Sequence, residues 1–220
     1  MIIFGVRTRV TESSEDDVLK NSCPNCGKDL VLSDLKQWFT LYFIPIFPVK
    51  HIETLYHCKN CDSSYKQSIK SHLQGNKEQQ ENIRQEGKRV MAVTLAACMT
   101  HMAKIDGKIS ESEKKEIKHL EKIAPEFKKD IENTVKEVST AKNNEKVYSL
   151  LRNAGKVLTA DGIMIIIGQV ARVVLADGKI DKKEEELMKE YMLVCGVPRE
   201  LYSTIIEKVK QNLKKVESKK

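Results

Sequence analysis

Four cysteines in two Cys-x-x-Cys pairs could hold a metal ion. Cys23 and Cys26 form the first pair, Cys58 and Cys61 form the second, and 31 residues lie between the pairs. Four thiolates are soft ligands that can surround one ion as a tetrahedron, an arrangement that suits zinc. A metal bound in this way stabilises a segment that is too small to fold around a core of its own. The sequence therefore predicts a structural zinc site formed by these four thiols.

The residue that follows each pair supports this prediction. Gly27 follows the first pair, and Asp62 follows the second. The turn around the metal often needs a left-handed backbone at this position, which glycine adopts freely and aspartate tolerates. We therefore expect two zinc knuckles, separated by an insertion that is longer than the usual spacing of such sites.

A second set of polar residues belongs to an internal repeat. Residues 105–113 and 176–184 share Asp-Gly-Lys-Ile and a later Glu, at an offset of 71 residues. This string resembles the second half of a calcium-binding EF-hand loop, whose first and third positions should carry oxygen ligands. Both copies lack those ligands and have Met102 and Lys104 or Val173 and Leu175 instead. The sequence therefore argues against a true EF-hand.

Two interpretations of the repeat are open. In the first, Ser110 and Asp181 cap helices, and a Glu three residues after each cap completes a capping box. In the second, a pseudo-twofold packing of the two copies gathers carboxylates around one hard cation, Ca²⁺ or Mg²⁺. The candidate ligands of this second divalent cation are Asp106, Glu113, Asp177, Asp181 and Glu184.

A small sheet must position the two knuckles. Alternating, β-branched and aromatic residues predict strands over residues 2–10 and 38–49, and residues 52–57 lead into the second knuckle. Pro45 and Pro48 interrupt the second run, which indicates an edge or a bend of the sheet. Residues 1–66 are therefore predicted to form a zinc ribbon.

Helices are predicted for the rest of the chain. Residues 67–89 are polar and indicate a linker, and residues 90–220 indicate an all-α domain. Helical periodicity favours helices over 90–105, 110–123, 127–141, 145–158, 163–175, 181–195 and 199–216. The 163–175 segment is apolar almost all round, so we expect it to be the central helix of a bundle. The predicted fold class is α+β multidomain, a small β zinc ribbon followed by an all-α bundle with an internal helix-turn-helix repeat.

The composition limits the class of protein. A length of 220 residues allows one or two domains, and 31% charged against 5% aromatic residues favours helices over a β-sandwich. The net charge of +7 permits contact with nucleic acid or anionic lipid without requiring it. The sequence shows no signal peptide and no apolar run of the roughly 18 residues that span a membrane. Together with reduced, metal-bound thiols, this predicts a cytoplasmic protein.

The first 66 residues resemble a bacterial zinc-ribbon family. The resemblance rests on the two knuckles and on the block of aromatic residues and prolines from Trp38 to Pro48. In that family, such a ribbon often precedes another domain.

The helical part is similar to the tellurite-resistance TerB-like family. The pattern behind this similarity is a buried helix ending in Ala-Asp-Gly and followed by an acidic helix, which residues 173–187 match. The first copy departs from the pattern, because Lys104 and Ile105 replace the usual small residue before Asp106. The resemblance implies an all-helical bundle, a role in stress responses, and binding of divalent metal through acidic residues.

Three functions compete on this basis. The first is a non-catalytic adaptor whose ribbon holds structural zinc and whose helical domain senses a divalent metal or docks a protein partner. The second is nucleic-acid binding by the ribbon, through basic residues such as Arg7 and Lys50 and aromatic ones such as Trp38. The third is association with a membrane surface, because an apolar insert between two knuckles resembles the arrangement in LITAF-type domains.

An enzyme is not expected. Four cysteines leave a zinc ion no open coordination position for a substrate. His101 and His119 lie in predicted helices without a nucleophile pattern nearby, and the sequence has no glycine loop for phosphate. No small-molecule substrate is indicated.

Overall fold

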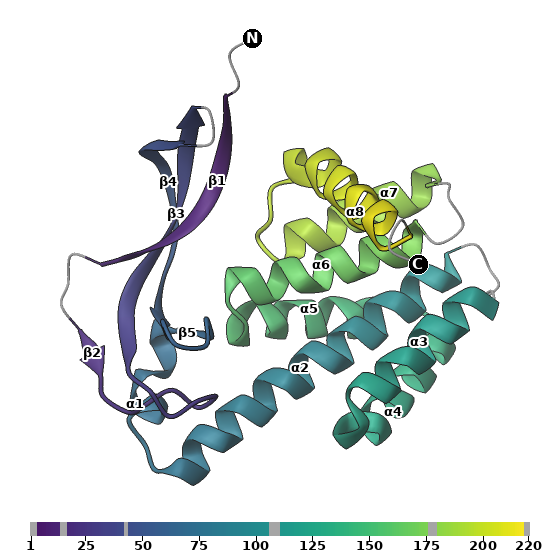
Figure 1. Cartoon of the computed structure of the whole chain (residues 1–220). Helices are drawn as coiled ribbons and strands as arrows, with labels where there is room; N and C mark the ends of the chain where they lie inside the picture. Colours follow the sequence, from purple (N-terminus) through teal and green to yellow (C-terminus); the bar gives the residue numbers. More distant parts are fainter. Residues whose placement is uncertain (1–3, 14–16, 42–43, 106–110, 176–179, 218–220) are drawn as a thin grey trace. The chain divides into compact units, whose positions relative to one another are not determined.

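The chain forms two compact units, residues 1–86 and 87–220. Figure 1 shows the computed structural model, which describes residues 4–13, 17–41, 44–105, 111–175 and 180–217. The first unit carries a small antiparallel sheet with the four cysteines, and the second unit is helical. The predicted α+β fold class is therefore confirmed. Among the described helices, none combines the length and the apolar character needed to cross a bilayer.

One antiparallel sheet forms most of the first unit. Its strands are β1 (Phe4–Glu12), β2 (Val18–Leu19), β3 (Leu30–Leu41), β4 (Ile44–His57) and β5 (Ser64–Lys66). The strand order is β1-β3-β4-β5, and β2 also pairs with β3. β3 and β4 form a long hairpin. β1 pairs with β3 up to the last residue of β3, and β5 pairs only with the last residues of β4. The sheet is thus three strands wide at the tip of the hairpin.

The run predicted as one strand over 38–49 is divided between two strands. Trp38 and Phe39 belong to β3, whereas Phe47 belongs to β4, so the run folds back on itself. Phe39 and Phe47 are direct partners, and their rings stack with centroids 5.2 Å apart. The prediction of a single strand was wrong because β-branched and aromatic residues favour strands, but the run contains no Asn-Gly or Asp-Gly turn signal.

Irregular pairing lengthens β4 relative to β3. The register shifts at three places, and Ile46, Val49 and Ile52 have no direct partner in β3. Each of these bulge residues is one extra residue in β4, which bends and twists the strand locally. Among the described strands, only β5 pairs with the outer edge of β4, and it stops at Leu55. The expectation that Pro45 and Pro48 lie at an edge is confirmed.

Residues 67–89, predicted as a polar linker, are mostly helical. They contain η1 (Gln67–Ile69), α1 (Lys70–Leu73) and the first part of α2 (Lys77–Lys104). Leu73 is fully buried in the apolar cluster of the first unit, and Ile83 packs against the same cluster. This stretch therefore supplies two apolar contacts to the ribbon.

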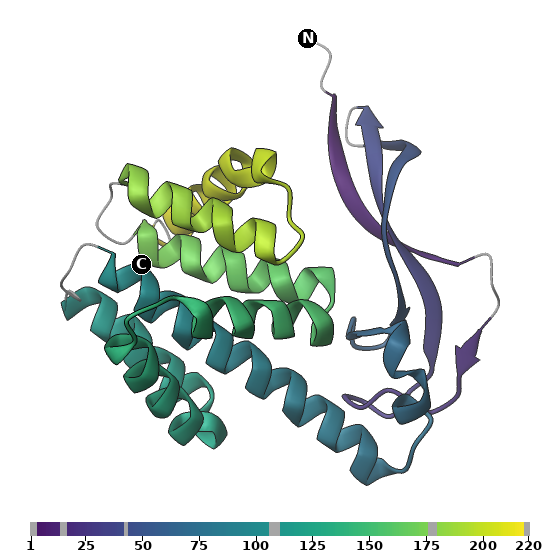
Figure 2. The ribbon, with the colours of Figure 1, turned by 180° about the vertical axis from the view of Figure 1, so that it is seen from behind.

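The second unit consists of the later part of α2 and the helices that follow it. These are α3 (Glu111–Ile123), α4 (Lys128–Thr140), α5 (Glu145–Val157), α6 (Ala160–Val174), α7 (Lys182–Val194) and α8 (Tyr202–Glu217). The short turns η2 (Pro125–Phe127) and η3 (Arg199–Leu201) precede α4 and α8. Figures 1 and 2 show α3 and α4 together on one side of α2 and α5 to α8 on the other. The helices predicted from residue 90 onward are all present.

Among the described residues of the helical domain, the longest continuous buried run lies in α2. Every residue from Ala92 to Ala103 is buried, because small side chains let neighbouring helices approach on all sides. α6 packs against α5, α7 and α8, but it leaves Met164 and Ile165 exposed. The 163–175 segment thus packs against three helices, as expected for a central helix, although the bundle does not cover it all round. The helix is apolar on nearly every face, and the bundle leaves one of these faces uncovered.

A buried histidine links two helices of the bundle. The Nδ1 atom of His101, in α2, lies 2.7 Å from the hydroxyl oxygen of Tyr191, in α7. The ring of Tyr148, from α5, packs edge-on against both rings. Burial lowers the pKa of His101, and the positive charge of Lys104 lowers this pKa further. The imidazole is therefore neutral in the folded protein at neutral pH.

This buried imidazole predicts a pH dependence of stability. Because folding lowers the pKa of His101 from its ordinary value of 6.5, the unfolded chain binds the proton more readily. The contribution of His101 to stability is fully present above pH 6.5 and is lost as the pH falls toward its lowered pKa. We expect His101→Gln to gain stability relative to wild type between about pH 7.5 and 5.5.

Urea unfolding of the two full-length proteins at several pH values measures this difference. The comparison cancels the pH dependence of the metal site, which both proteins share. His119→Gln, at an exposed position on α3, is the matched control and should show no such gain. A constant difference between wild type and His101→Gln over this pH range would contradict the prediction.

Candidate metal centre

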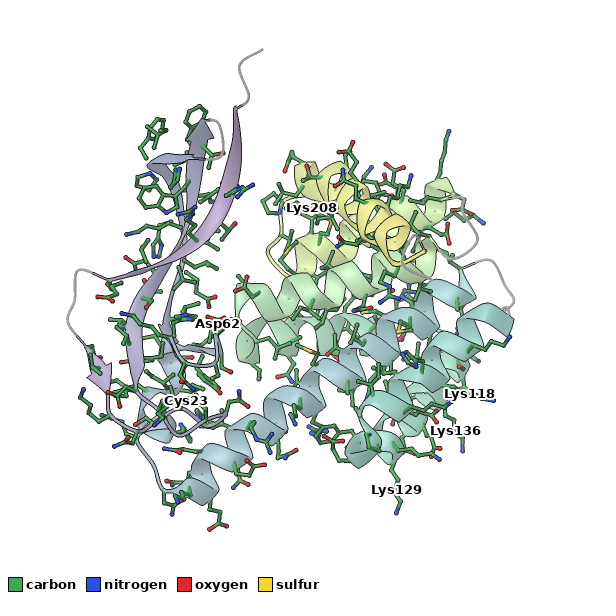
Figure 3. All side chains as sticks on the ribbon, in the orientation of Figure 1. Cys23, Asp62, Lys118, Lys129, Lys136 and Lys208 are labelled. Atoms are coloured by element: carbon green, nitrogen blue, oxygen red, sulfur yellow. The ribbon has the colours of Figure 1, made fainter. Side chains whose placement is uncertain are left out.

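The two cysteine pairs lie on two knuckles with the same backbone hydrogen bonds. In the first, the amide of Gly27 donates to the carbonyl of Cys23 at 2.8 Å; in the second, the amide of Asp62 donates to that of Cys58 at 2.9 Å. Gly27 and Asp62 both have left-handed backbones, with φ of 68° and 56°. The conformation expected after each pair is therefore confirmed. Figure 3 labels Cys23 and Asp62, one residue from each knuckle.

The hairpin brings the two knuckles together. β3 begins at Leu30, shortly after the first knuckle, and β4 ends at His57, directly before the second. Val31 and His57 are direct partners, so both knuckles lie at the base of the same hairpin. The long insertion between the cysteine pairs is this hairpin.

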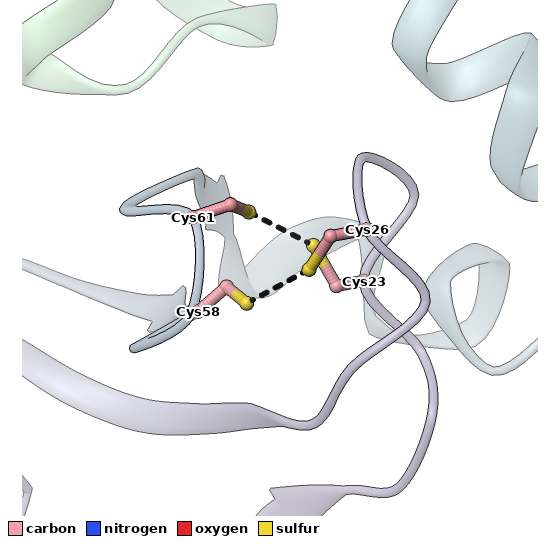
Figure 4. Close-up of side chains that lie close together, drawn as sticks. All are labelled: Cys23, Cys26, Cys58 and Cys61. Carbon is pink, nitrogen blue, oxygen red and sulfur yellow. Dashed lines mark hydrogen bonds between the residues drawn. The ribbon is translucent and has the colours of Figure 1, made fainter.

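The four sulfur atoms form one compact cluster. All four lie within 4.8 Å of one another, with Cys23 Sγ 3.6 Å from Cys61 Sγ and Cys26 Sγ 3.5 Å from Cys58 Sγ (Figure 4). Four sulfurs at about 2.3 Å from one zinc ion would be separated by about 3.8 Å. The thiols are free and not joined as disulfides. The donor set and its spacing thus fit a tetrahedral metal site.

The thiols differ in how readily they ionise. Burial raises the pKa of Cys23 to about 12 and also raises the pKa of Cys58. Burial also opposes ionisation of Cys61, but hydrogen bonds from Ser63 and Asn25 outweigh it and lower the pKa of Cys61 to about 6. Without a cation, four thiolates at this spacing would repel one another. A bound dication would remove this repulsion and favour deprotonation of all four.

The nearby histidine does not belong to the cluster. His57 precedes Cys58, but its Nδ1 lies 3.1 Å from Ser64 Oγ and its Nε2 lies 3.6 Å from Asp62 Oδ1. In the part of the chain that the structure describes, the four cysteines are the whole group of potential metal ligands. The arrangement can therefore fix a metal by four thiolates, and it offers no additional side chain as a fifth ligand.

A polar contact that no sequence pattern indicated joins three segments of the ribbon. Asp17 accepts a hydrogen bond from the Lys70 side chain at 2.6 Å and another from the Tyr56 hydroxyl at 2.5 Å. Hydrogen bonds from Lys70 and Tyr56 lower the pKa of Asp17, which is therefore ionised at neutral pH. This contact joins the segment before β2, strand β4 and α1. No sequence signal marked it, because Asp17 belongs to an acidic segment that looks like a solvated loop.

The acidic repeat is only partly covered by the structure. Asp106 and Asp177 lie outside the described residues, and so does the side chain of Glu113, although its backbone belongs to α3. The amides of Lys183 and Glu184 donate to the Asp181 carboxylate, and the amide of Asp181 donates to the Glu184 carboxylate. The capping box predicted for the second copy is therefore confirmed. Whether the five carboxylates gather around a cation stays a prediction.

Two family profiles match the chain. A zinc-ribbon family matches residues 21–112, and the family described as tellurite resistance protein TerB matches residues 92–205. The TerB match covers more than half of the 220 residues. The order of the two matches confirms the predicted architecture.

Similarity to one other protein covers only a small part of the chain. An uncharacterised protein of Dictyostelium discoideum is 34% identical over 64 residues, which are 29% of this chain and 30% of that protein. The chain thus matches less than a third of that relative's length. No solved structure matches the chain significantly.

The capping box predicts how Asp181 responds to substitution. Asp181→Ala removes the acceptor for two backbone amides and should lower the free energy of unfolding by about 1 kcal/mol. Asp181→Asn should retain most of the stability, because Asn is also a good N-cap. Urea unfolding of full-length protein, with and without added Ca²⁺ or Mg²⁺, measures both effects. If the cation stabilises the wild type but neither variant, the Asn variant will lose as much stability relative to wild type as the Ala variant does when the cation is present. In that case Asp181 is a metal ligand instead.

Proposed function

The chain belongs to the tellurite-resistance TerB family, and on this premise we propose that it is a non-catalytic adaptor, with a structural zinc ion in the ribbon and a helical domain that docks a protein partner. The observation that supports this most strongly is the cluster of four sulfurs within 4.8 Å of one another. Four thiolates complete the tetrahedron that zinc prefers in structural sites, whereas catalytic sites keep one position for water or substrate.

Zinc would be held by Cys23, Cys26, Cys58 and Cys61. Its contribution would be to fold the ribbon, because the apolar cluster of this unit is small and includes Cys23 and Cys58 themselves. The hydrogen bonds within each knuckle orient the thiols before the ion binds. Cysteines that bind metal and do not form disulfides would be consistent with the cytoplasmic location that we propose.

Docking is the role that we propose for the helical domain, in preference to sensing a divalent cation. The Asp181 carboxylate accepts a hydrogen bond from the Glu184 amide, and the Glu184 carboxylate accepts one from the amide of Asp181, which precedes α7; these bonds explain both carboxylates without a cation. The description of the family, tellurite resistance protein, supports a stress response as the process that the adaptor serves.

Cobalt substitution tests the structural role of the metal. Co²⁺ in place of zinc gives absorption bands that report thiolate ligation and tetrahedral geometry. We expect one ion per chain and a four-thiolate spectrum that added azide leaves unchanged, because no position is open. Cys61→Ser should weaken the thiolate bands and make the spectrum sensitive to azide. Cys195→Ser, at a half-buried thiol outside the cluster, is the matched control and should behave as wild type.

A wild-type spectrum that changes with azide would reveal an open position and overturn the non-catalytic assignment. Absence of zinc from protein purified without added metal would overturn the ribbon site itself.

Titration of zinc-loaded protein with Ca²⁺ or Mg²⁺ separates docking from sensing. Saturable binding that is lost in Asp177→Ala/Glu184→Ala would replace docking by cation sensing.

A further inference from the structure

The distal part of the β3–β4 hairpin exposes a row of apolar side chains. Ile46, Phe47, Val49 and Ile52, here called the apolar strip, all lie on β4 and are 52%, 51%, 55% and 40% exposed. Single exposed apolar residues are common, but four within seven residues of one strand are a concentration of apolar exposure of the kind found at interaction surfaces.

The pairing irregularities of β4 produce most of this strip. Ile46, Val49 and Ile52 are the three bulge residues, each without a direct partner in β3. A bulge residue is not held opposite a cross-strand neighbour that could cover it, and bulges serve to redirect side chains. The repetition at every third residue, each time with a β-branched aliphatic side chain, shows that the exposure is a regular feature of the hairpin.

Basic residues predominate around the apolar strip, and the carboxylate of Glu53, which follows Ile52, lies 3.8 Å from the amine of Lys66. Residues 4–11 and 35–52, which form the distal part of β1, β3 and β4, contain no Asp or Glu. Arg7, Arg9 and Lys50 are exposed in the same segments. Lys36 is also present and pairs with Asp34 at 2.8 Å, at the border of this region. Arg7 and Arg9 pair with Trp38 and Lys36, whereas Lys50 pairs with Gln37, so the two arginines and Lys50 lie on opposite faces of the sheet. The distal sheet thus carries basic side chains on both faces in addition to the apolar strip, which complements a negatively charged, partly apolar surface.

A partner strand does not fit the open edge of β4. Pro45 and Pro48 have no backbone N–H to donate, and the three bulges interrupt the hydrogen-bonding ladder. Single-stranded nucleic acid fits less well than lipid, because aliphatic side chains offer no ring on which bases stack. Of the rings in this region, Phe47 already stacks on Phe39, and Trp38 is only half-exposed.

We propose that the distal hairpin docks on an anionic lipid surface, with the apolar strip inserted at the boundary of headgroups and acyl chains and Arg7, Arg9 and Lys50 near the lipid phosphates. Apolar insertion and attraction of basic residues to anionic lipids are the two contributions that hold interfacial segments on membranes. This inference is independent of the adaptor role and needs only a folded ribbon.

Flotation of the full-length, zinc-loaded protein with vesicles tests the proposal. Vesicles of phosphatidylcholine with about 30% phosphatidylglycerol should carry the protein, and pure phosphatidylcholine should carry far less. Rising salt should weaken the binding. Ile46→Ser/Val49→Ser should reduce partitioning by about tenfold or more. Met164→Ser/Ile165→Ser, at similarly exposed positions on α6, is the matched control and should leave it unchanged.

A charge-reversal pair provides a second measurement if the serine variant fails to fold. Arg9→Glu/Lys50→Glu should reduce binding to the anionic vesicles by about tenfold or more. Lys118→Glu/Lys129→Glu, on α3 and α4 (Figure 3), makes the same change of charge elsewhere and should have little effect. Zinc content and thermal unfolding of each variant must match wild type.

Three outcomes would overturn the proposal. The first is failure of the wild-type protein to float with anionic vesicles. The second is binding that the hairpin variants and their controls reduce equally. The third is binding of a single-stranded oligonucleotide, without binding of vesicles, that Arg9→Glu/Lys50→Glu abolishes, which would make the hairpin a nucleic-acid surface.

Discussion

Folding of the first unit depends on bringing together two cysteine pairs that are separated by 31 intervening residues in the sequence. The β3–β4 hairpin achieves this, because pairing of Val31 with His57 puts both knuckles at its base. Closing such a loop costs conformational entropy, and the small apolar cluster offers limited compensation. Four thiols within reach of a single ion supply the missing stabilisation when metal binds. The distal end of the hairpin is free of this constraint and can carry side chains unrelated to the metal.

Local chemistry made much of this protein predictable from its sequence. The spacing of the cysteines, the left-handed positions at Gly27 and Asp62, and the cap at Asp181 all depend on residues close together in the chain. Helical periodicity likewise identified the helices after residue 90, because amphipathic faces are a local pattern.

Contacts between residues that are far apart in the sequence could not be predicted from the sequence. The reversal inside the aromatic run and the bulges of β4 depend on how two strands align, which composition does not encode. The hydrogen bond between His101 and Tyr191 joins residues 90 positions apart. Enclosure of α2 and partial exposure of α6 depend in the same way on which helices surround each one. A stretch of apolar residues predicts a helix that can be buried, but not how completely its neighbours cover it.

The burial of Leu73 has a consequence for biosynthesis. Both knuckles leave the ribosome before α1 and α2, yet Leu73 and Ile83 contribute to the apolar cluster that includes the thiols. A nascent chain that ends shortly after Cys61 therefore carries every ligand but lacks part of the packing around them. Because chains fold in the order in which they are synthesised, metal capture during translation should become stable only after the first turns of α2 have emerged.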